Sequence, residues 1–229
     1  MDPDFFVKTE YAYVSPPGID EKLIEEISRQ KDDPSWVEDI RKRALKEFLE
    51  APMPRWGPDL RGLNLNNLIY YIKPLNKRAS TWEELPPFIR ETFERLGVPE
   101  AERKFLAGVG AQFESEMVYH NMKKELESQG IIFAAMDEAV KEYPDLVREY
   151  FGKVVPIGDN KFSALTYAVW GGGSFLYVPR GVKLEKPVYA YFRMNGSNEG
   201  TFDRTLIIAE ENSYVHYIEN CTAPRYSEA

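Results

Sequence analysis

The sequence predicts an α+β fold in which a helical N-terminal region precedes a series of short β-strands. Up to about residue 152, amphipathic helical patterns alternate with loops marked by proline and glycine. Beyond residue 152, the apolar residues come in short strand-like runs separated by glycine, proline, asparagine and aspartate. We therefore expect two domains: a helical one with an irregular arm over residues 1–152, and an incomplete β-domain over residues 153–229.

Start and stop signals place the helices of the first domain. Asp20 is positioned to cap a short helix over residues 21–29, and Asp33 followed by Pro34 is a second start signal. The other predicted helices are residues 36–48, residues 87–96, a stretch from Pro99 that breaks at residues 108–112, residues 112–128, and two short helices from Asp137 and Pro144. His120 falls in the helix over residues 112–128 without a second metal ligand one turn away, which favours a structural role.

Composition and charge exclude several classes of protein. The 229 residues carry a formal net charge of -8, which argues against a nucleic-acid-binding protein. No apolar run approaches the roughly 18 residues of a membrane helix, and the N-terminus lacks the basic and apolar regions of a secretory signal. A single cysteine cannot form an internal disulfide and suits a reducing compartment. We expect a cytoplasmic protein that contacts neither nucleic acid nor a membrane.

The second domain reads as closely spaced strands. The strand-like runs are residues 174–178, 187–192, 202–208 and 213–218. An apolar run at residues 165–170 precedes them and is interpreted as part of the same strand-rich region. These runs lie too close together for helical crossovers, and their spacing fits a sandwich, a barrel or a β-helix. Three successive glycines, residues 171–173, favour a tight corner over an anion-binding loop.

Cys221 is the first candidate for chemistry, because it is the only cysteine and follows the last of these runs. In a straight strand, alternation places it on the side of Glu219 and Tyr217 and opposite His216, so the sequence does not predict a Cys–His pair. One cysteine and two distant histidines cannot form a zinc site, and one thiolate cannot hold an iron–sulfur cluster alone.

Several blocks of sequence closely resemble the SufB family, the scaffold subunits of the Suf iron–sulfur cluster assembly system. The blocks occur in the family's order and are residues 94–103, 107–112, 118–121, 158–162, 172–175, 191–195 and 216–224. The last of them reads His-Tyr-Ile-Glu-Asn-Cys-Thr-Ala-Pro. The resemblance covers at least residues 80–226.

The resemblance implies a fold and a set of partners. The fold is a helical N-terminal region followed by the first rungs of a right-handed parallel β-helix, so residues 153–229 would be an incomplete β-helix core. The partners are SufC, an ATPase, and SufD, a paralogue, with persulfide sulfur supplied by a cysteine desulfurase. The iron–sulfur cluster is transient and forms only in the full complex. Whether a flavin takes part stays open.

The resemblance also implies roles for three residues. Cys221 falls on the family's sulfur-accepting cysteine, and Asn220 replaces a glycine before it. Arg193 and Asn195 match polar residues implicated in a sulfur path. Arg193 has two interpretations: a cation that helps to hold an anionic persulfide, or a solvated arginine on the outer face of a strand.

The family continues for roughly as many residues again, so we expect this chain to be a fragment or one half of a split protein. We expect a scaffold and sulfur acceptor, not an enzyme, completed by SufD or a separately encoded C-terminal half. The alternative is a truncated SufB-like interaction module without sulfur-carrying activity. A β-helix carbohydrate enzyme is a weaker rival, since the strands show no obvious carboxylate cluster.

Overall fold

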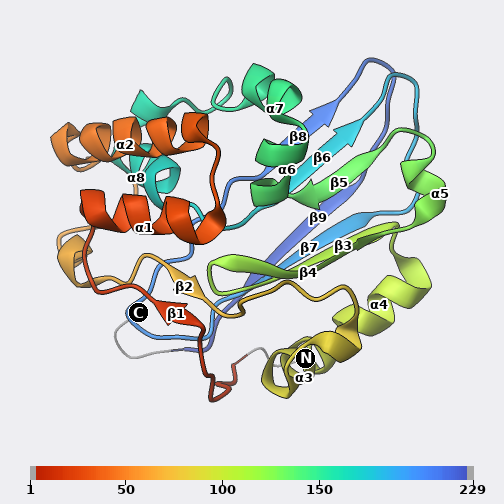
Figure 1. The fold of residues 1–229 in the computed structure, drawn as a ribbon, viewed down its shortest axis with the longest axis horizontal. Helices are drawn as coiled ribbons and strands as arrows, with labels where there is room; N and C mark the ends of the chain where they lie inside the picture. The colour runs from red at the N-terminus through yellow and green to blue at the C-terminus, as the bar shows by residue number, and fades with distance from the viewer. Residues whose placement is uncertain (1–3, 226–229) are drawn as a thin grey trace.

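The computed structural model describes residues 4–225 and shows an α+β protein (Figure 1). The helices are α1 Glu21–Lys31, α2 Ser35–Glu50, α3 Pro87–Arg95, α4 Val98–Phe105, α5 Lys124–Glu127, α6 Met136–Glu142, α7 Pro144–Tyr150 and α8 Lys161–Val169. The strands are β1 Tyr13–Val14, β2 Ile72–Lys73, β3 Gly108–Phe113, β4 Glu116–Met122, β5 Ile132–Ala135, β6 Ser174–Val178, β7 Val188–Arg193, β8 Leu206–Ala209 and β9 Tyr217–Thr222.

The capping signals locate most helices correctly. The Asp20 carboxylate accepts a hydrogen bond from the Leu23 amide at 2.9 Å and starts α1 as expected. Gly97 has a φ of 74° and separates α3 from α4. Asp33 behaves differently, because no side chain caps α2. Its buried carboxylate instead accepts a hydrogen bond at 2.7 Å from Arg41, which lies within α2.

The predicted helix over residues 112–128, and the helix break before it, are wrong. Residues 108–122 form an antiparallel hairpin of β3 and β4, in which Glu114 adopts a left-handed conformation at the turn. Gly108 and Gly110 are strand residues whose missing side chains leave room for the Asn121 carbonyl and for Met117. Glycine inside a strand marks such close approaches, and this is why the glycines resembled a helix break. His120 therefore lies in β4, with its ring centre 4.6 Å from that of Phe133.

The apolar run at residues 165–170 is likewise not a strand. It belongs mostly to α8, whose N-terminus is capped by Asn160 through the amides of Phe162 and Ser163. Helix α8 is buried on most of its surface against α1 and α2. A helix that is apolar on nearly all sides shows no helical stripe in the sequence, so its run is indistinguishable from a buried strand.

The last four strands alternate between two sheets. One sheet has the order β4-β3-β7-β9 and the other β5-β6-β8. Strands β6 and β8 pair in parallel within one sheet, and β7 and β9 pair in parallel within the other. The predicted strands at 174–178 and 187–192 are confirmed, and those at 202–208 and 213–218 lie a few residues further along the chain. Both sheets contain strands from either side of residue 152, and the division into two domains there stays a prediction.

Helices cover the outer faces of the two sheets (Figure 1). Helices α3 and α4 pack on the β4-β3-β7-β9 sheet through a cluster that includes Phe93 and Phe113. Helices α6 and α7 pack on the β5-β6-β8 sheet through a cluster that includes Val140 and Phe175. Smaller apolar clusters lie between the sheets, and one of them consists of Met117, Ala135, Ala190 and Phe192. Figure 1 shows α1, α2 and α8 together at one end of the sheets.

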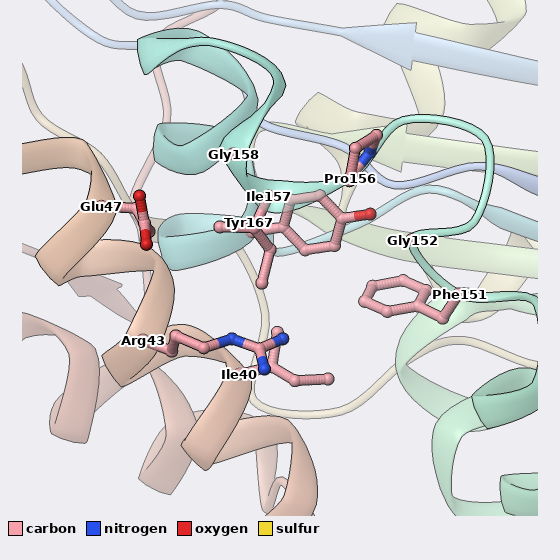
Figure 2. Close-up of a pocket in the computed structure, with 9 residues that line it drawn as sticks. All are labelled: Ile40, Arg43, Glu47, Phe151, Gly152, Pro156, Ile157, Gly158 and Tyr167. Carbon is pink, nitrogen blue, oxygen red and sulfur yellow. The ribbon is translucent and has the colours of Figure 1, made fainter. Parts of the chain in front are cut away.

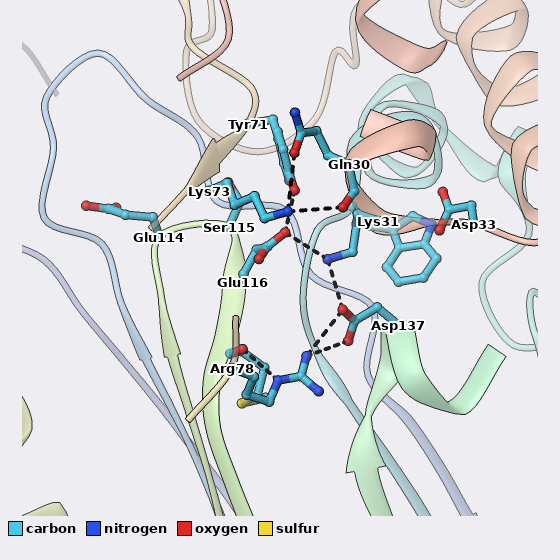
Figure 3. A network of polar contacts seen from close by, with 12 residues as sticks. Gln30, Lys31, Asp33, Tyr71, Lys73, Arg78, Glu114, Ser115, Glu116 and Asp137 are labelled. Atoms are coloured by element: carbon cyan, nitrogen blue, oxygen red, sulfur yellow. Dashed lines mark hydrogen bonds and ion pairs between the residues drawn. The ribbon is translucent and has the colours of Figure 1, made fainter. Parts of the chain in front are cut away.

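A buried network of charges connects this helical end to the sheets (Figure 3). The Lys31 ammonium at the end of α1 lies 3.3 Å from Glu116 of β4 and 3.0 Å from Asp137 of α6. Arg78 contacts the same Asp137 carboxylate at 3.0 Å, and the Tyr71 hydroxyl donates to Glu116. Burial alone would raise the pKa of Asp137, but the charges of Lys31 and Arg78 outweigh it and hold that pKa well below its usual range. The network therefore fixes the end of α1 against β4 and α6.

Gly173 provides a test of how closely the chain packs where it enters β6. Its φ is 106°, and a Cβ there would lie 2.2 Å from the backbone oxygen of Arg204. We expect Gly173→Ala to lower the free energy of unfolding by about 2 kcal/mol or more, since left-handed strain and a backbone clash add together. Gly181→Ala is the matched control, with a φ of 75° and no atom within 4 Å of the new Cβ. It should cost only about 1 kcal/mol of strain. Equal effects of both substitutions in urea denaturation would contradict the packing argument.

Candidate functional site

Cys221 is exposed and lies in β9, which is an edge strand among the described residues. It is paired with Phe192 of β7, which is in turn paired with Gln112 of β3. Residues paired in register point to the same side of a sheet, so these three side chains form one row across three strands. Phe192 belongs to an apolar cluster between the two sheets. The Cys221 thiol therefore lies at the outer end of a row that begins in the protein interior.

A cavity of about 450 Å³ opens at this end of the row. It is lined by Phe192, Met194, Glu199, Gly200, Thr201, Asp203, Cys221, Thr222 and Ala223. The apolar wall comes from the strands, and the two carboxyl groups come from the segment between β7 and β8. The cavity thus places a thiol and two acids in one space.

The acids of this cavity hold protons more tightly than free carboxyl groups do. Burial raises the pKa of Asp203 to about 7, the charge of Glu219 adds to the shift, and a hydrogen bond from Gln112 opposes it. That bond runs from Gln112 Nε2 to Asp203 Oδ1 at 2.6 Å and fixes the carboxyl group. Burial and the neighbouring Glu114 carboxyl raise the pKa of Glu199 well above its usual range. Near neutral pH, Asp203 is therefore a group that can take or give a proton.

The surroundings of Cys221 disfavour its thiolate. Although Cys221 is exposed at the surface, partial burial of its thiol raises the pKa, and the charges of Glu219 and Asp203 raise it further. Glu219 is held in place by the Tyr217 hydroxyl at 2.9 Å and by the Thr205 hydroxyl at 3.3 Å. These contacts agree with the predicted shared face of Tyr217, Glu219 and Cys221. His216 precedes β9 and is exposed.

Arg193 and Asn195 are buried and lie away from the Cys221 thiol. Arg193 is paired with Thr222, the next residue after Cys221, so its side chain leaves the opposite face of the sheet. Its guanidinium donates to the Thr222 hydroxyl at 3.3 Å and to the Phe5 carbonyl. The interpretation of Arg193 as a solvated surface residue is wrong, because only 1% of its surface is exposed. The structure does not bring the three predicted site residues into one cavity.

A second cavity, of about 320 Å³, lies between α2 and the segment that leads into α8 (Figure 2). Its walls include the aromatic rings of Phe151 and Tyr167, with Arg43 and Glu47 of α2 at the side. The Tyr167 hydroxyl donates to the Val155 carbonyl at 2.7 Å. Since this cavity contains no thiol and its two charged residues are solvent-exposed, its chemistry is less specific than that of the Cys221 cavity.

Two further features of the described residues bear on the kind of site. Among residues 4–225, no group of three or more His, Cys, Asp or Glu side chains is arranged to hold a metal ion. No helix in the described part of the chain has the length and apolar character needed to cross a membrane.

Sequence reasoning missed Gln112, Asp203 and Glu199. Gln112 was assigned to a helix, so its place in a row with Cys221 was hidden. Asp203 and Glu199 lie between strands and carry no motif. Only the pairing of β3 with β7, which is a contact between distant parts of the chain, brings these groups together.

Comparison with known proteins supports the resemblance seen in the sequence. Residues 86–189 match a family model described as the SufBD protein N-terminal region. Over 210 residues, 92% of this chain, it is 54% identical to the iron-sulfur cluster assembly protein SufB of Bacillus subtilis. The chain therefore matches the SufBD family in its N-terminal region. It is also 55% identical to an iron-sulfur cluster assembly SufBD family protein of Staphylococcus haemolyticus. The resemblance found in the sequence blocks is thereby confirmed, and the chain spans 45% of the length of each of these SufBD relatives.

The electrostatics of Cys221 can be tested by alkylation. We expect Glu219→Gln to lower the pKa of Cys221, because it removes a negative charge that raises that pKa. The shift should be a fraction of a unit, or about a two-fold faster reaction with iodoacetamide near pH 8. Glu211→Gln is the control, because Glu211 is exposed and pairs with Arg180 instead. Unchanged alkylation profiles for Glu219→Gln would show that its charge does not act on the thiol.

Proposed function

We propose that this chain is part of an iron–sulfur cluster assembly scaffold in which Cys221 accepts persulfide sulfur. The observation that carries the proposal is the exposed thiol at the rim of a cavity that also holds Asp203. The printed names of the SufBD relatives support it, since they describe iron–sulfur cluster assembly proteins. The protein would act in the reducing cytoplasm, where a free thiol persists.

The transfer is an exchange between a thiol and a persulfide, in which electrons and protons balance. The Cys221 thiol loses its proton, and the thiolate attacks the outer sulfur of a donor persulfide. The donor's sulfur–sulfur bond breaks as the Cys221–sulfur bond forms, and the donor leaves as a thiolate that takes up a proton. Asp203, with a pKa of about 7, can accept the first proton and return it to the leaving thiolate. No net oxidation or reduction occurs.

The β-strand arrangement supports a larger assembly. We infer that the alternation of β6, β7, β8 and β9 between two sheets is the beginning of a right-handed parallel β-helix. Strands β8 and β9 are each the last strand of their sheet within the described residues, so each offers a free edge for continued pairing. SufD, or a separately encoded C-terminal half, would supply the next strands, with SufC and a cysteine desulfurase as further partners. In this assembly the chain is a scaffold, and the cluster is its product.

Arg193 and Asn195 keep their proposed role in the path of sulfur, although on a different face from Cys221. Their positions mean that they would act on sulfur only outside the Cys221 cavity.

The rival function is an interaction module that carries no sulfur. One observation favours that rival: the acids around Cys221 raise its pKa and so reduce the thiolate that a relay needs.

Sulfur loading separates the two functions. After incubation with a cysteine desulfurase and cysteine, we expect intact-protein mass spectrometry to show the mass of one added sulfur on this chain. Cys221→Ser should abolish the increment, since Cys221 is the only thiol. Asp203→Asn should slow loading several-fold, because the nearby proton acceptor is lost.

The control is a full-length SufBD relative loaded under the same conditions. An increment on the relative but none on this chain would overturn the relay and establish the module.

A further inference from the structure

The residues before β1 form an extended arm that lies against the ends of β7 and β9. From residue 4 to residue 14 the exposure alternates at every position, as in a strand with one covered face. Phe5, Val7 and Tyr11 face the protein, and the intervening Phe6 is 60% exposed. The two adjacent phenylalanines therefore have opposite environments.

Phe5 is held by two arginines. Its ring lies 3.6 Å from the guanidinium carbon of Arg95 and 4.5 Å from that of Arg193. Its carbonyl oxygen also accepts a hydrogen bond from Arg193. Contact of one aromatic ring with two guanidinium groups is a favourable cation–π arrangement.

Asn195 holds the backbone of Val7. The side-chain oxygen accepts from the Val7 amide at 3.0 Å, and the side-chain nitrogen donates to the Val7 carbonyl at 2.8 Å. One amide side chain thus makes both bonds that a neighbouring strand would make. Because these contacts involve only backbone atoms of Val7, they select for an extended conformation and not for a particular side chain.

Glu114 completes the surface. Its Oε1 accepts from the Tyr11 hydroxyl at 2.5 Å, and its Oε2 accepts from the Asn195 backbone amide at 3.1 Å. The Glu114 carboxylate therefore holds both Tyr11 of the arm and Asn195, the residue that binds the arm's backbone. We call Arg95, Glu114, Arg193 and Asn195 the arm-binding surface.

The arm is held by side chains and not by a ladder of backbone bonds. The first strand pairing of this segment begins at Tyr13. Ordering extended residues costs conformational entropy that a few side-chain contacts only partly offset. Residues 4–11 can thus detach from the protein and bind again while β1 stays paired with β2.

We propose that the arm-binding surface is a binding site for extended peptide segments, and that residues 4–11 occupy it as a built-in, displaceable occupant. The segment that displaces the arm has the same chemistry: an aromatic residue, then an extended backbone two positions later. This inference does not rest on sulfur transfer, although Arg193 and Asn195 belong to both proposals and Glu114 also interacts with Glu199 of the Cys221 cavity.

The experiment uses the full chain and a fluorescent synthetic peptide of residues 4–12. In the unsubstituted chain the tethered arm competes at an effective concentration of about millimolar, so micromolar peptide should bind weakly. Phe5→Ala weakens the tethered arm but leaves the surface intact. We expect it to bind the peptide at least tenfold more tightly in fluorescence anisotropy. Phe6→Ala is the matched control and should behave as the unsubstituted chain, because Phe6 faces solvent.

Two further measurements keep the test decisive. In the double variant Phe5→Ala, Asn195→Ala, the gain in peptide affinity should be lost. In the single variant Phe5→Ala, amide hydrogen exchange should become faster only at residues 4–11. Equal peptide binding by the Phe5→Ala, Phe6→Ala and unsubstituted chains would overturn the proposal. Faster exchange throughout the protein would also overturn it, since the arm would then be an integral part of the fold.

Discussion

The burial of β3 on both faces is the constraint on which the rest of the structure depends. All six of its residues are buried, and it pairs with β4 on one side and with β7 on the other. Val109, Ala111 and Phe113 face the cluster beneath α3 and α4, whereas Gly108 and Gly110 let the other sheet approach closely. Because β7 pairs with β9, the position of Cys221 is fixed by a strand more than a hundred residues earlier in the chain.

The same constraint explains what the sequence could reveal. Signals that act within one turn of the chain were read correctly: Asp20 starts a helix and Gly97 separates two. Strand alternation also placed Cys221 on the face of Glu219, because only the local period was needed. Each of these depends on hydrogen bonds or sterics between residues close in sequence.

What the sequence could not reveal depends on distant contacts. Gly110 in β3 was read as a helix break, because a glycine that admits a neighbouring side chain looks the same as one that ends a helix. Helix α8 was read among strands because burial on most sides removes its stripe. The partners of Arg193 were hidden for the same reason: Phe5 lies almost the whole chain away.

The placement of charge around Cys221 bears on how its thiol could be ionised. Burial, Glu219 and Asp203 all favour the neutral thiol, and the chain as a whole carries a net charge of -8. Electrostatic attraction and thiolate stabilisation both require positive charge. The guanidinium of Arg193 leaves the opposite face of the sheet and contacts Phe5. A thiol in this setting is stable until a partner brings a cation to the open side of the cavity. A basic segment docked beside the cavity would therefore lower the pKa of Cys221 and promote its ionisation.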